Sequence, residues 1–259
     1  MQSSVISGIG VRHSGHGPAL VLVPGLAGLA KFWDGVGQVL AERFRVIAID
    51  HPGRGSSGAV PAHSIRAAVD GLVRVLDELA VQRCSVVGHS TGGLVAQSLA
   101  LDFPSRLHKL VLSSTWAVPD QRFRDLFRLR QLVLDRAGHA AYARLGQLLA
   151  YPQEWYERHL SKEAFTSQDP AHGPDTQAIS QRIEMLLTYQ RAEELGSIRH
   201  PTLVVGAFDD NIVTFNHSQD LARRIPGAKL SELTGGHFTP TTRTADYARL
   251  IATFVGDIN

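Results

Sequence analysis

The sequence predicts an α/β fold with a mostly parallel sheet and helices on both of its faces. Short apolar runs that are typical of buried strands alternate with segments of helical period along most of the chain, which is the pattern of repeated β-α-β units. A serine also stands in a glycine-containing turn between one such strand and a helix of small residues. With 259 residues and a hydrophobic content of 44%, the chain is long enough to bury one substantial core.

Six apolar runs are expected to form the strands. They comprise residues 19–23, 45–49, 85–88, 109–113, 202–206 and 229–233. Strands that alternate with helical segments in this way pair in parallel. The first helix is expected at about 30–43, the second from its N-cap Ser64 to residue 80, and the last within 242–255.

The alternation stops after Ser113 and resumes after Arg199. Between them lies a helical stretch that is rich in arginine and aromatic residues. We therefore expect a core made of residues 1–115 and 200–259, interrupted by a helical insertion at 116–199.

The turn Gly88-His89-Ser90-Thr91-Gly92 is the strongest functional signal. It follows the apolar run Cys84-Ser85-Val86-Val87 and precedes a small-residue helix at 93–100. Small flanking residues suit a sharp strand-to-helix turn that leaves a serine hydroxyl exposed. The helix directs unpaired backbone N–H groups and the positive end of its dipole toward the place where an oxyanion would form. The pattern predicts a nucleophile elbow with Ser90 as the nucleophile.

Two further residue types stand where an acid and a base are needed. Asp209 and Asp210 follow the fifth predicted strand, and His237 follows the sixth. Side chains at the carboxyl ends of parallel strands gather at one edge of the sheet, where ligand sites form. Serine, aspartate and histidine in this chain order are typical of one class of catalytic triad. Counting from Gly206 alone would select Asp209 as the acid.

The turn and two other segments resemble the α/β-hydrolase-fold enzymes, over nearly the whole chain. The segments are Val23-Pro24-Gly25-Leu26, after the first predicted strand, and Asp50-His51-Pro52-Gly53-Arg54-Gly55-Ser56-Ser57, after the second. Many relatives have His-Gly in place of Pro24-Gly25, so the glycine of that loop is kept here. The resemblance implies that the insertion at 116–199 is the cap of such an enzyme.

The resemblance also implies which aspartate completes the triad with Ser90 and His237. In relatives the acid is usually followed three residues later by Val or Thr, and then by Pro. Val213 fits that register when the acid is Asp210, and Thr214 stands where the Pro is common. Asp209 would then cap backbone N–H groups of its own loop.

Backbone N–H groups are implied to form the oxyanion hole, and they do not depend on the identity of the side chain. The two donors would be those of Leu26 and Thr91. Gly25 precedes Leu26 in the chain, and His89 lies shortly before Thr91. Both residues are expected to line the substrate site.

Three segments of the insertion resemble a narrower group, the aminoacrylate hydrolases of uracil breakdown, and less closely the 3-oxoadipate enol-lactonases. They are Ser114-Thr115-Trp116, residues 123–130 and residues 148–155. This resemblance implies hydrolysis of a small acyl, enamine or lactone compound that bears a carboxylate. A guanidinium facing the pocket would bind such a carboxylate through two parallel hydrogen bonds. The substrate-binding residues expected in the insertion are Trp116, Phe123, Arg124 and Trp155.

These observations predict a serine hydrolase that cleaves an ester, lactone or amide-type bond through an acyl-enzyme. The same triad would also support hydrolysis of a C–C bond or cofactor-free perhydrolysis. A haloalkane dehalogenase or an epoxide hydrolase would need a carboxylate nucleophile where Ser90 stands. A third interpretation is a non-catalytic ligand receptor of the same fold.

The remaining features predict a protein that works on a small molecule without a metal or a cofactor. The formal net charge of +2 is weak support for a nucleic-acid partner. The first residues lack the pattern of a signal peptide, and the chain lacks an apolar run of membrane-spanning length, so a cytoplasmic protein is expected. The twelve histidines form no metal-ligand motif, and Cys84 is expected to be a buried, inert thiol. No feature of the sequence indicates an oligomeric state.

Overall fold

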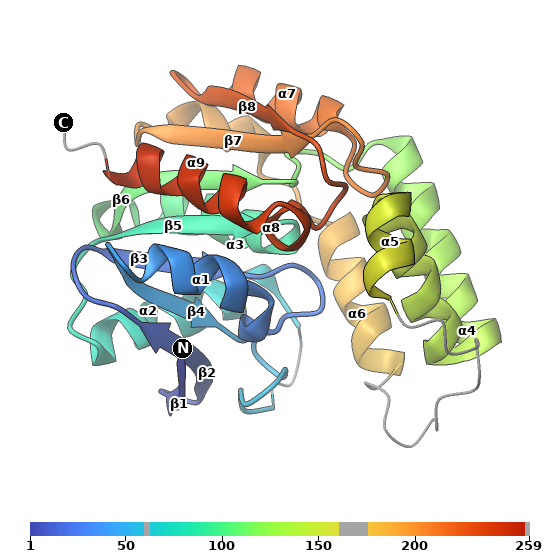
Figure 1. Ribbon diagram of the computed structural model, residues 1–259, viewed down its shortest axis with the longest axis horizontal. Helices are drawn as coiled ribbons and strands as arrows, with labels where there is room; N and C mark the ends of the chain where they lie inside the picture. Colours follow the sequence, from blue (N-terminus) through green and yellow to red (C-terminus); the bar gives the residue numbers. More distant parts are fainter. Residues whose placement is uncertain (60–62, 161–175, 257–259) are drawn as a thin grey trace.

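The computed structural model describes residues 1–59, 63–160 and 176–256 (Figure 1). Its centre is an eight-stranded sheet in the order β1-β2-β4-β3-β5-β6-β7-β8. β2 pairs antiparallel with β1 and with β4, and all other neighbouring strands are parallel. The strands are β1 Gln2–Ile6, β2 Ile9–Ser14, β3 Ala19–Val23, β4 Arg45–Ile49, β5 Cys84–His89, β6 Leu107–Ser113, β7 Thr202–Ala207 and β8 Lys229–Leu233.

The six strands expected from the sequence are β3 to β8, and they form the parallel part of the sheet. This confirms the predicted fold class. β5 and β6 begin earlier than expected because Cys84 and Leu107, at their first positions, already pair with each other.

The antiparallel hairpin of β1 and β2 is not predicted by the apolar pattern. No residue of β1 is buried, so the strand leaves no apolar run in the sequence. Ser7 and Gly8 connect the two strands with φ angles of 49° and 76°, as in a two-residue turn of type I′. His13 lies in β2 and pairs with Gln2.

Side chains of alternate sheet residues enter two separate apolar cores. In β3, Leu20 and Leu22 pack with α1 (Asp34–Leu40) and α9 (Thr244–Gly256) on one face. Val21 and Val23 face α2 (Ile65–Glu78) and α3 (Thr91–Asp102) on the other. Figure 1 shows α1 and α9 in front of the sheet and α2 and α3 behind it. Because both faces are covered, the central strands are apolar throughout, as expected for a parallel sheet.

The helices agree with the sequence prediction in position but less well in their bounds. The Ser64 hydroxyl caps α2 by accepting a hydrogen bond from the N–H of Ala67 at 3.0 Å, as expected. The helix expected at 30–43 begins as a 3₁₀ turn, η1 (Ala30–Trp33), and its α-helical part ends at Leu40. The last helix is divided into α8 (Thr239–Thr242) and α9 by the non-helical backbone of Arg243.

Three helices between β6 and β7 lie together at one end of the sheet (Figure 1), and we call them the inserted helices. They are α4 (Gln121–Ala150), α5 (Gln153–His159) and α6 (Thr176–Leu187). α4 is kinked at Gly138, whose φ of 79° is not helical. Residues 161–175 of the expected insertion lie outside the described part, and its predicted limits at 116 and 199 stay a prediction. None of the helices described here has the length and hydropathy needed to cross a membrane.

Short helices complete the connections. η2 (Pro104–Arg106) leads from α3 into β6, and η4 (Ala192–Ser197) leads from α6 toward β7. α7 (Phe215–Arg224) joins β7 to β8 and buries Leu221 in the core that α2 and α3 share. The loops after β3, β5, β7 and β8 all end at the side of the sheet where the inserted helices lie, so they approach one another there.

Candidate active site

Ser90 occupies a strained turn between β5 and α3. Its φ and ψ angles are 55° and −123°, a conformation that non-glycine residues rarely adopt. The turn is held by a hydrogen bond from the N–H of Ser90 to the carbonyl of Ser113 at 2.8 Å and by one from Gly93 N–H to the carbonyl of Ser90 at 2.8 Å. Strain of this kind persists only where the surrounding structure fixes it.

The two glycines of the turn are required by close packing. A side chain at Gly88 would collide with the carbonyl oxygen of Gly92 and with Cβ of Ala96. A side chain at Gly92 would collide with the carbonyl oxygens of Val23 and Pro24, at the end of β3. The strained torsion therefore belongs to Ser90 itself, while Gly88 and Gly92 allow α3 to approach the neighbouring strands.

The loops after β7 and β8 place a histidine against an aspartate. His237 Nδ1 donates a hydrogen bond to Asp210 Oδ2 at 2.8 Å, and both side chains are buried. The other carboxylate oxygen of Asp210 accepts from the N–H groups of Ile212 and Val213 at 2.8 and 2.9 Å. These bonds fix the carboxylate, which in turn fixes the tautomer and the orientation of the imidazole, and Nε2 has no hydrogen-bond partner among the described residues.

Asp209 points to the backbone of the histidine loop instead. Its carboxylate accepts from the N–H of Gly235 at 2.9 Å and from that of Gly236 at 3.0 Å. The same loop is fastened to the end of α4, because the N–H of His237 donates to the carbonyl of Ala150 at 2.8 Å. The two neighbouring aspartates thus have different partners: Asp210 contacts the imidazole, and Asp209 holds the loop.

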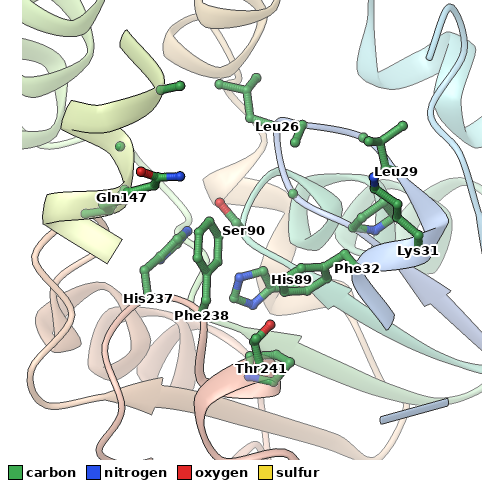
Figure 2. A pocket seen from close by; sticks show the side chains of 18 of the residues that line it. Leu26, Leu29, Lys31, Phe32, His89, Ser90, Gln147, His237, Phe238 and Thr241 are labelled. Carbon is green, nitrogen blue, oxygen red and sulfur yellow. The ribbon is translucent and has the colours of Figure 1, made fainter. Parts of the chain in front are cut away.

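One pocket of about 910 Å³ brings Ser90 and His237 together under the inserted helices. Figure 2 shows the Ser90 and His237 side chains beside each other, with the Gln147 amide directed toward them. Within the described residues Ser90 Oγ makes no hydrogen bond, so its contact with the imidazole is not formed in this state. Catalytic hydrogen bonds often tighten only when a substrate is bound.

Two backbone donors adjoin the serine. Neither Leu26 N–H nor Thr91 N–H has a hydrogen-bond acceptor in the described part of the chain, and Leu26 lines the pocket. Thr91 is the first residue of α3, where helical N–H groups are unpaired and the helix dipole is positive. A Cβ at Gly25 would lie 3.2 Å from Cβ of Ser90, so a side chain there would crowd the serine.

His89 forms an apolar wall of the pocket. Its ring stacks on Phe32 with 5.1 Å between the centroids, and it lies 5.0 Å from the His237 ring. Burial, and secondarily the charge of His237, lowers the pKa of His89 well below its ordinary value. His89 is therefore held neutral, and its imidazole is a weaker base than an unperturbed histidine.

The four residues of the insertion that were expected to bind substrate do not line the described pocket. Trp116 and Phe123 are completely buried and pack on each other at 4.4 Å between centroids, so they belong to the core beneath the helices. Arg124 donates to the carbonyl of Leu187 at 3.1 Å, and the Trp155 ring stacks on Tyr151. The structure places different residues of the inserted helices in the lining, among them Phe127, Arg130, Tyr142, Gln147, Tyr151 and Arg182.

A helical spacing in the sequence would have revealed part of this lining. Phe123, Phe127, Arg130 and Leu134 recur at intervals of three and four, so they share the buried face of α4. An arginine on such a face is unusual, because arginine side chains are rarely buried unless they are paired. Arg182 carries the same signal on α6, where it lies beside the buried Ile183.

His51 supports the loop that carries Leu26. Its side chain is buried, and Nε2 donates to the carbonyl of Pro24 at 2.8 Å. Burial, with a smaller contribution from the charge of Arg182, lowers the pKa of His51 from 6.5 to about 4. The folded protein therefore holds His51 neutral over a range of pH in which the unfolded chain would protonate it.

This difference makes the protein less stable in acid. The contribution of His51 to the free energy of unfolding is lost as the pH falls from its unfolded pKa of about 6.5 toward its folded pKa. Between pH 7 and pH 5, His51 alone is expected to lower the free energy of unfolding by about 2 kcal/mol. Urea unfolding of wild type and His51→Asn at both pH values measures this. The variant should show a smaller loss between pH 7 and pH 5, whereas His16→Asn should keep the full loss. Equal losses in wild type and His51→Asn would contradict the assignment.

The structure offers few groups suited to other chemistry. Among the residues that it describes, no group of three or more His, Cys, Asp or Glu side chains is placed to hold a metal ion. Cys84 is buried, and its burial raises the pKa of the thiol to about 12, so the thiolate is scarce at neutral pH.

The chain is similar to known hydrolases over its whole length. It is 35% identical to the Caulobacter sp. (strain K31) protein named "Putative carbamate hydrolase RutD", covering 99% of both chains. The protein of the same name from Pseudomonas syringae pv. syringae (strain B728a) is 36% identical over 242 residues, which cover 92% of this chain and 93% of that one.

A solved structure shares the fold. The enol-lactonase from Burkholderia xenovorans LB400 superposes with a TM-score of 0.85 at 22% identity, covering 99% of this chain and 100% of that one. The family model described as alpha/beta hydrolase fold matches residues 18–243. This chain therefore belongs to the alpha/beta hydrolase fold family, and it is a hydrolase.

Proposed function

We propose that the protein is a serine hydrolase that cleaves an ester, lactone or amide-type bond of a small substrate through an acyl-enzyme. The observation that carries this proposal is the hydrogen bond of 2.8 Å between His237 and Asp210, in a pocket that also contains Ser90. A buried carboxylate that orients a histidine beside a serine is the arrangement that activates a hydroxyl as a nucleophile.

In the first half of the reaction, His237 Nε2 takes the proton of the Ser90 hydroxyl as Oγ attacks the carbonyl carbon. The oxyanion that forms would accept hydrogen bonds from Leu26 N–H and Thr91 N–H, which lack other acceptors among the described residues. Collapse of the tetrahedral intermediate breaks the bond to the leaving group, which takes the proton from His237. Asp210 stabilises the imidazolium during these steps without taking its proton.

In the second half, water replaces the leaving group. His237 accepts a proton from the water, whose oxygen attacks the acyl carbon on Ser90. Ser90 then leaves and regains its proton from His237, which restores the enzyme. Every proton is passed between substrate, water and these two side chains, so the cycle needs no external reductant or oxidant.

The name of the relatives suggests which amide-type bond to include. A carbamate carries its carbonyl between two heteroatoms, and it would be attacked by Ser90 in the same way as an ester. The pocket of about 910 Å³ has room for a small molecule. We further propose that the inserted helices act as the cap of the pocket, because Tyr142 and Gln147 of α4 line it together with Ser90.

A substrate panel tests the proposed activity. Wild type is assayed with p-nitrophenyl esters of increasing acyl length, small lactones and aryl carbamates. At least one activated ester should give a rapid release of nitrophenol, followed by slower turnover as the acyl-enzyme hydrolyses. The absence of turnover on every member of the panel, with saturable binding of the same compounds, would favour a ligand receptor over an enzyme of this type.

A further inference from the structure

Two arginines of the inserted helices are buried in the wall of the pocket. Arg130 of α4 is 9% exposed and Arg182 of α6 is 4% exposed, and both line the space that contains Ser90. Among the described residues no acidic side chain forms an ion pair with either of them. Their neighbours on the same helices are paired in the usual way, since Arg128 binds Glu184 across the outer surface.

The surroundings of Arg130 are aromatic. Its guanidinium lies 4.6 Å from the centroid of the Tyr142 ring and 5.1 Å from that of Phe127. Its Nε is buried and has no hydrogen-bond partner among the described atoms. A Cβ at Gly146 would lie 3.1 Å from Nη2 of Arg130, so the absence of a side chain at this position leaves room beside the guanidinium. The rings hold the cation in place without neutralising it.

Arg182 lies near the same tyrosine and close to the loop after β3. A side chain at Gly28 would collide with its Nη2, which places the guanidinium against that loop. Arg54 also lines the pocket and adds a further positive charge near Arg182. Its Nε donates a hydrogen bond to the carbonyl of Ala27. Asp34 is the acidic residue of the described lining, and it pairs with Arg12 at 2.7 Å.

The charges remain on both arginines at neutral pH. Burial is the main cause that lowers the pKa of Arg130, and it lowers that of Arg182 to about 10, with the charge of Arg54 as the second cause. A group with a pKa near 10 is almost fully protonated at pH 7. Two cations are thus removed from water in one pocket, without the anions that normally accompany buried charges.

We propose that Arg130 and Arg182 form an anion subsite that binds a carboxylate of the substrate while its scissile carbonyl lies at Ser90. This inference rests on the proposed function, because it assigns the two ends of one substrate to the two ends of one pocket. A carboxylate accepts two parallel hydrogen bonds from a guanidinium, and in a buried pocket such charge-assisted bonds are strong. The apolar and aromatic lining between the ends, which includes Phe127 and Ile179, suits a short hydrocarbon spacer.

Matched substrates test the subsite. The p-nitrophenyl monoester of glutaric acid carries a free carboxylate, and its methyl ester is a neutral control of similar shape. Wild type should have the higher kcat/KM with the anion. Arg182→Met and Arg130→Met should each lower kcat/KM for the anion by about 10- to 100-fold and change it less than about threefold for the neutral ester. Arg136→Met, which alters an exposed arginine of α4, should leave both values unchanged.

Thermal unfolding separates a binding role from a structural one. Methionine keeps much of the arginine's apolar volume and removes an unpaired buried charge, so Arg182→Met should have a Tm equal to or above that of wild type. A lower Tm together with an equal loss of both substrates would mean that Arg182 supports the fold, and it would overturn the proposal. A wild type that prefers the neutral ester would overturn it as well.

Binding of the free diacid distinguishes failure of the subsite from failure of the proposed function. Calorimetry measures the binding of glutarate to Ser90→Ala and to the double variant Ser90→Ala/Arg182→Met. This measurement does not depend on turnover. Binding that is weakened by about 10-fold or more in the double variant supports the subsite even if no ester is hydrolysed. Equal binding by both proteins, or inorganic phosphate binding as tightly as glutarate, overturns the assignment to a carboxylate.

Discussion

Ser90→Ala is expected to lower kcat by about 10⁴-fold or more on any substrate that wild type hydrolyses. The change removes the attacking oxygen and leaves the pocket otherwise intact. Alanine has the same backbone strain as serine at a φ of 55°, so the fold should tolerate it. Kinetic assays with the best ester of the panel, together with Tm and far-ultraviolet circular dichroism, measure the effect.

Ser114→Ala is the matched control for this change. Ser114 is also buried, and it also has a left-handed backbone with a φ of 44°, but it does not line the described pocket. Its variant should retain activity close to that of wild type. Turnover by Ser90→Ala within about tenfold of wild type would show that another group attacks the substrate.

The two adjacent aspartates give the second large effect. Asp210→Asn is expected to lower kcat by about 10⁴-fold, because an amide that donates a hydrogen bond to Nδ1 would leave His237 in the wrong tautomer. Asp209→Asn replaces one of the two carboxylate oxygens that face the N–H groups of Gly235 and Gly236 by a donor and removes the negative charge, so it should cost about 1 kcal/mol of stability with a much smaller loss of kcat.

Measuring kcat and urea unfolding for both variants compares these roles directly. The expected pattern is opposite in the two measurements: Asp210→Asn mainly affects the rate, and Asp209→Asn mainly affects stability. A crippled Asp209→Asn beside a nearly normal Asp210→Asn would reverse the assignment of the acid. Because the two residues are neighbours in the chain and carry the same side chain, each variant serves as the control for the other.

The parallel sheet could be predicted from the sequence because its central strands are buried on both faces. Runs such as residues 19–23 and 45–49 are apolar throughout, which is a local signal. The turn at Ser90 is also local, since it depends on small residues that follow one another in the chain. The placement of Asp210 on His237 follows from the ends of two neighbouring strands, β7 and β8.

Residues with exposed or mixed surroundings could not be predicted so well. β1 is an edge strand of the sheet, and none of its side chains is buried, so its sequence resembles that of a loop. The helix expected at 30–43 ends at Leu40, where the chain turns back toward β4 through hydrogen bonds that the apolar pattern does not reveal.

The lining of the pocket was the least predictable part. Trp116 and Phe123 are large aromatic residues near the insertion, yet they fill the core beneath it. Whether such a ring faces the substrate depends on how the inserted helices pack on the sheet, which is a long-range property. Arg130 and Arg182 are 52 positions apart in the sequence, and the packing of α4 against α6 brings both to one pocket.

Covalent labelling tests most directly the claim that Ser90 is an activated nucleophile. A fluorophosphonate reacts with such a serine when Oγ attacks phosphorus and fluoride leaves, which gives a stable adduct. After incubation with the probe, intact-mass spectrometry and peptide mapping are expected to show a single adduct, on Ser90, with activity lost in proportion to labelling. An unlabelled Ser90 in a protein that continues to hydrolyse esters, or a stoichiometric adduct on a different residue, would contradict the claim.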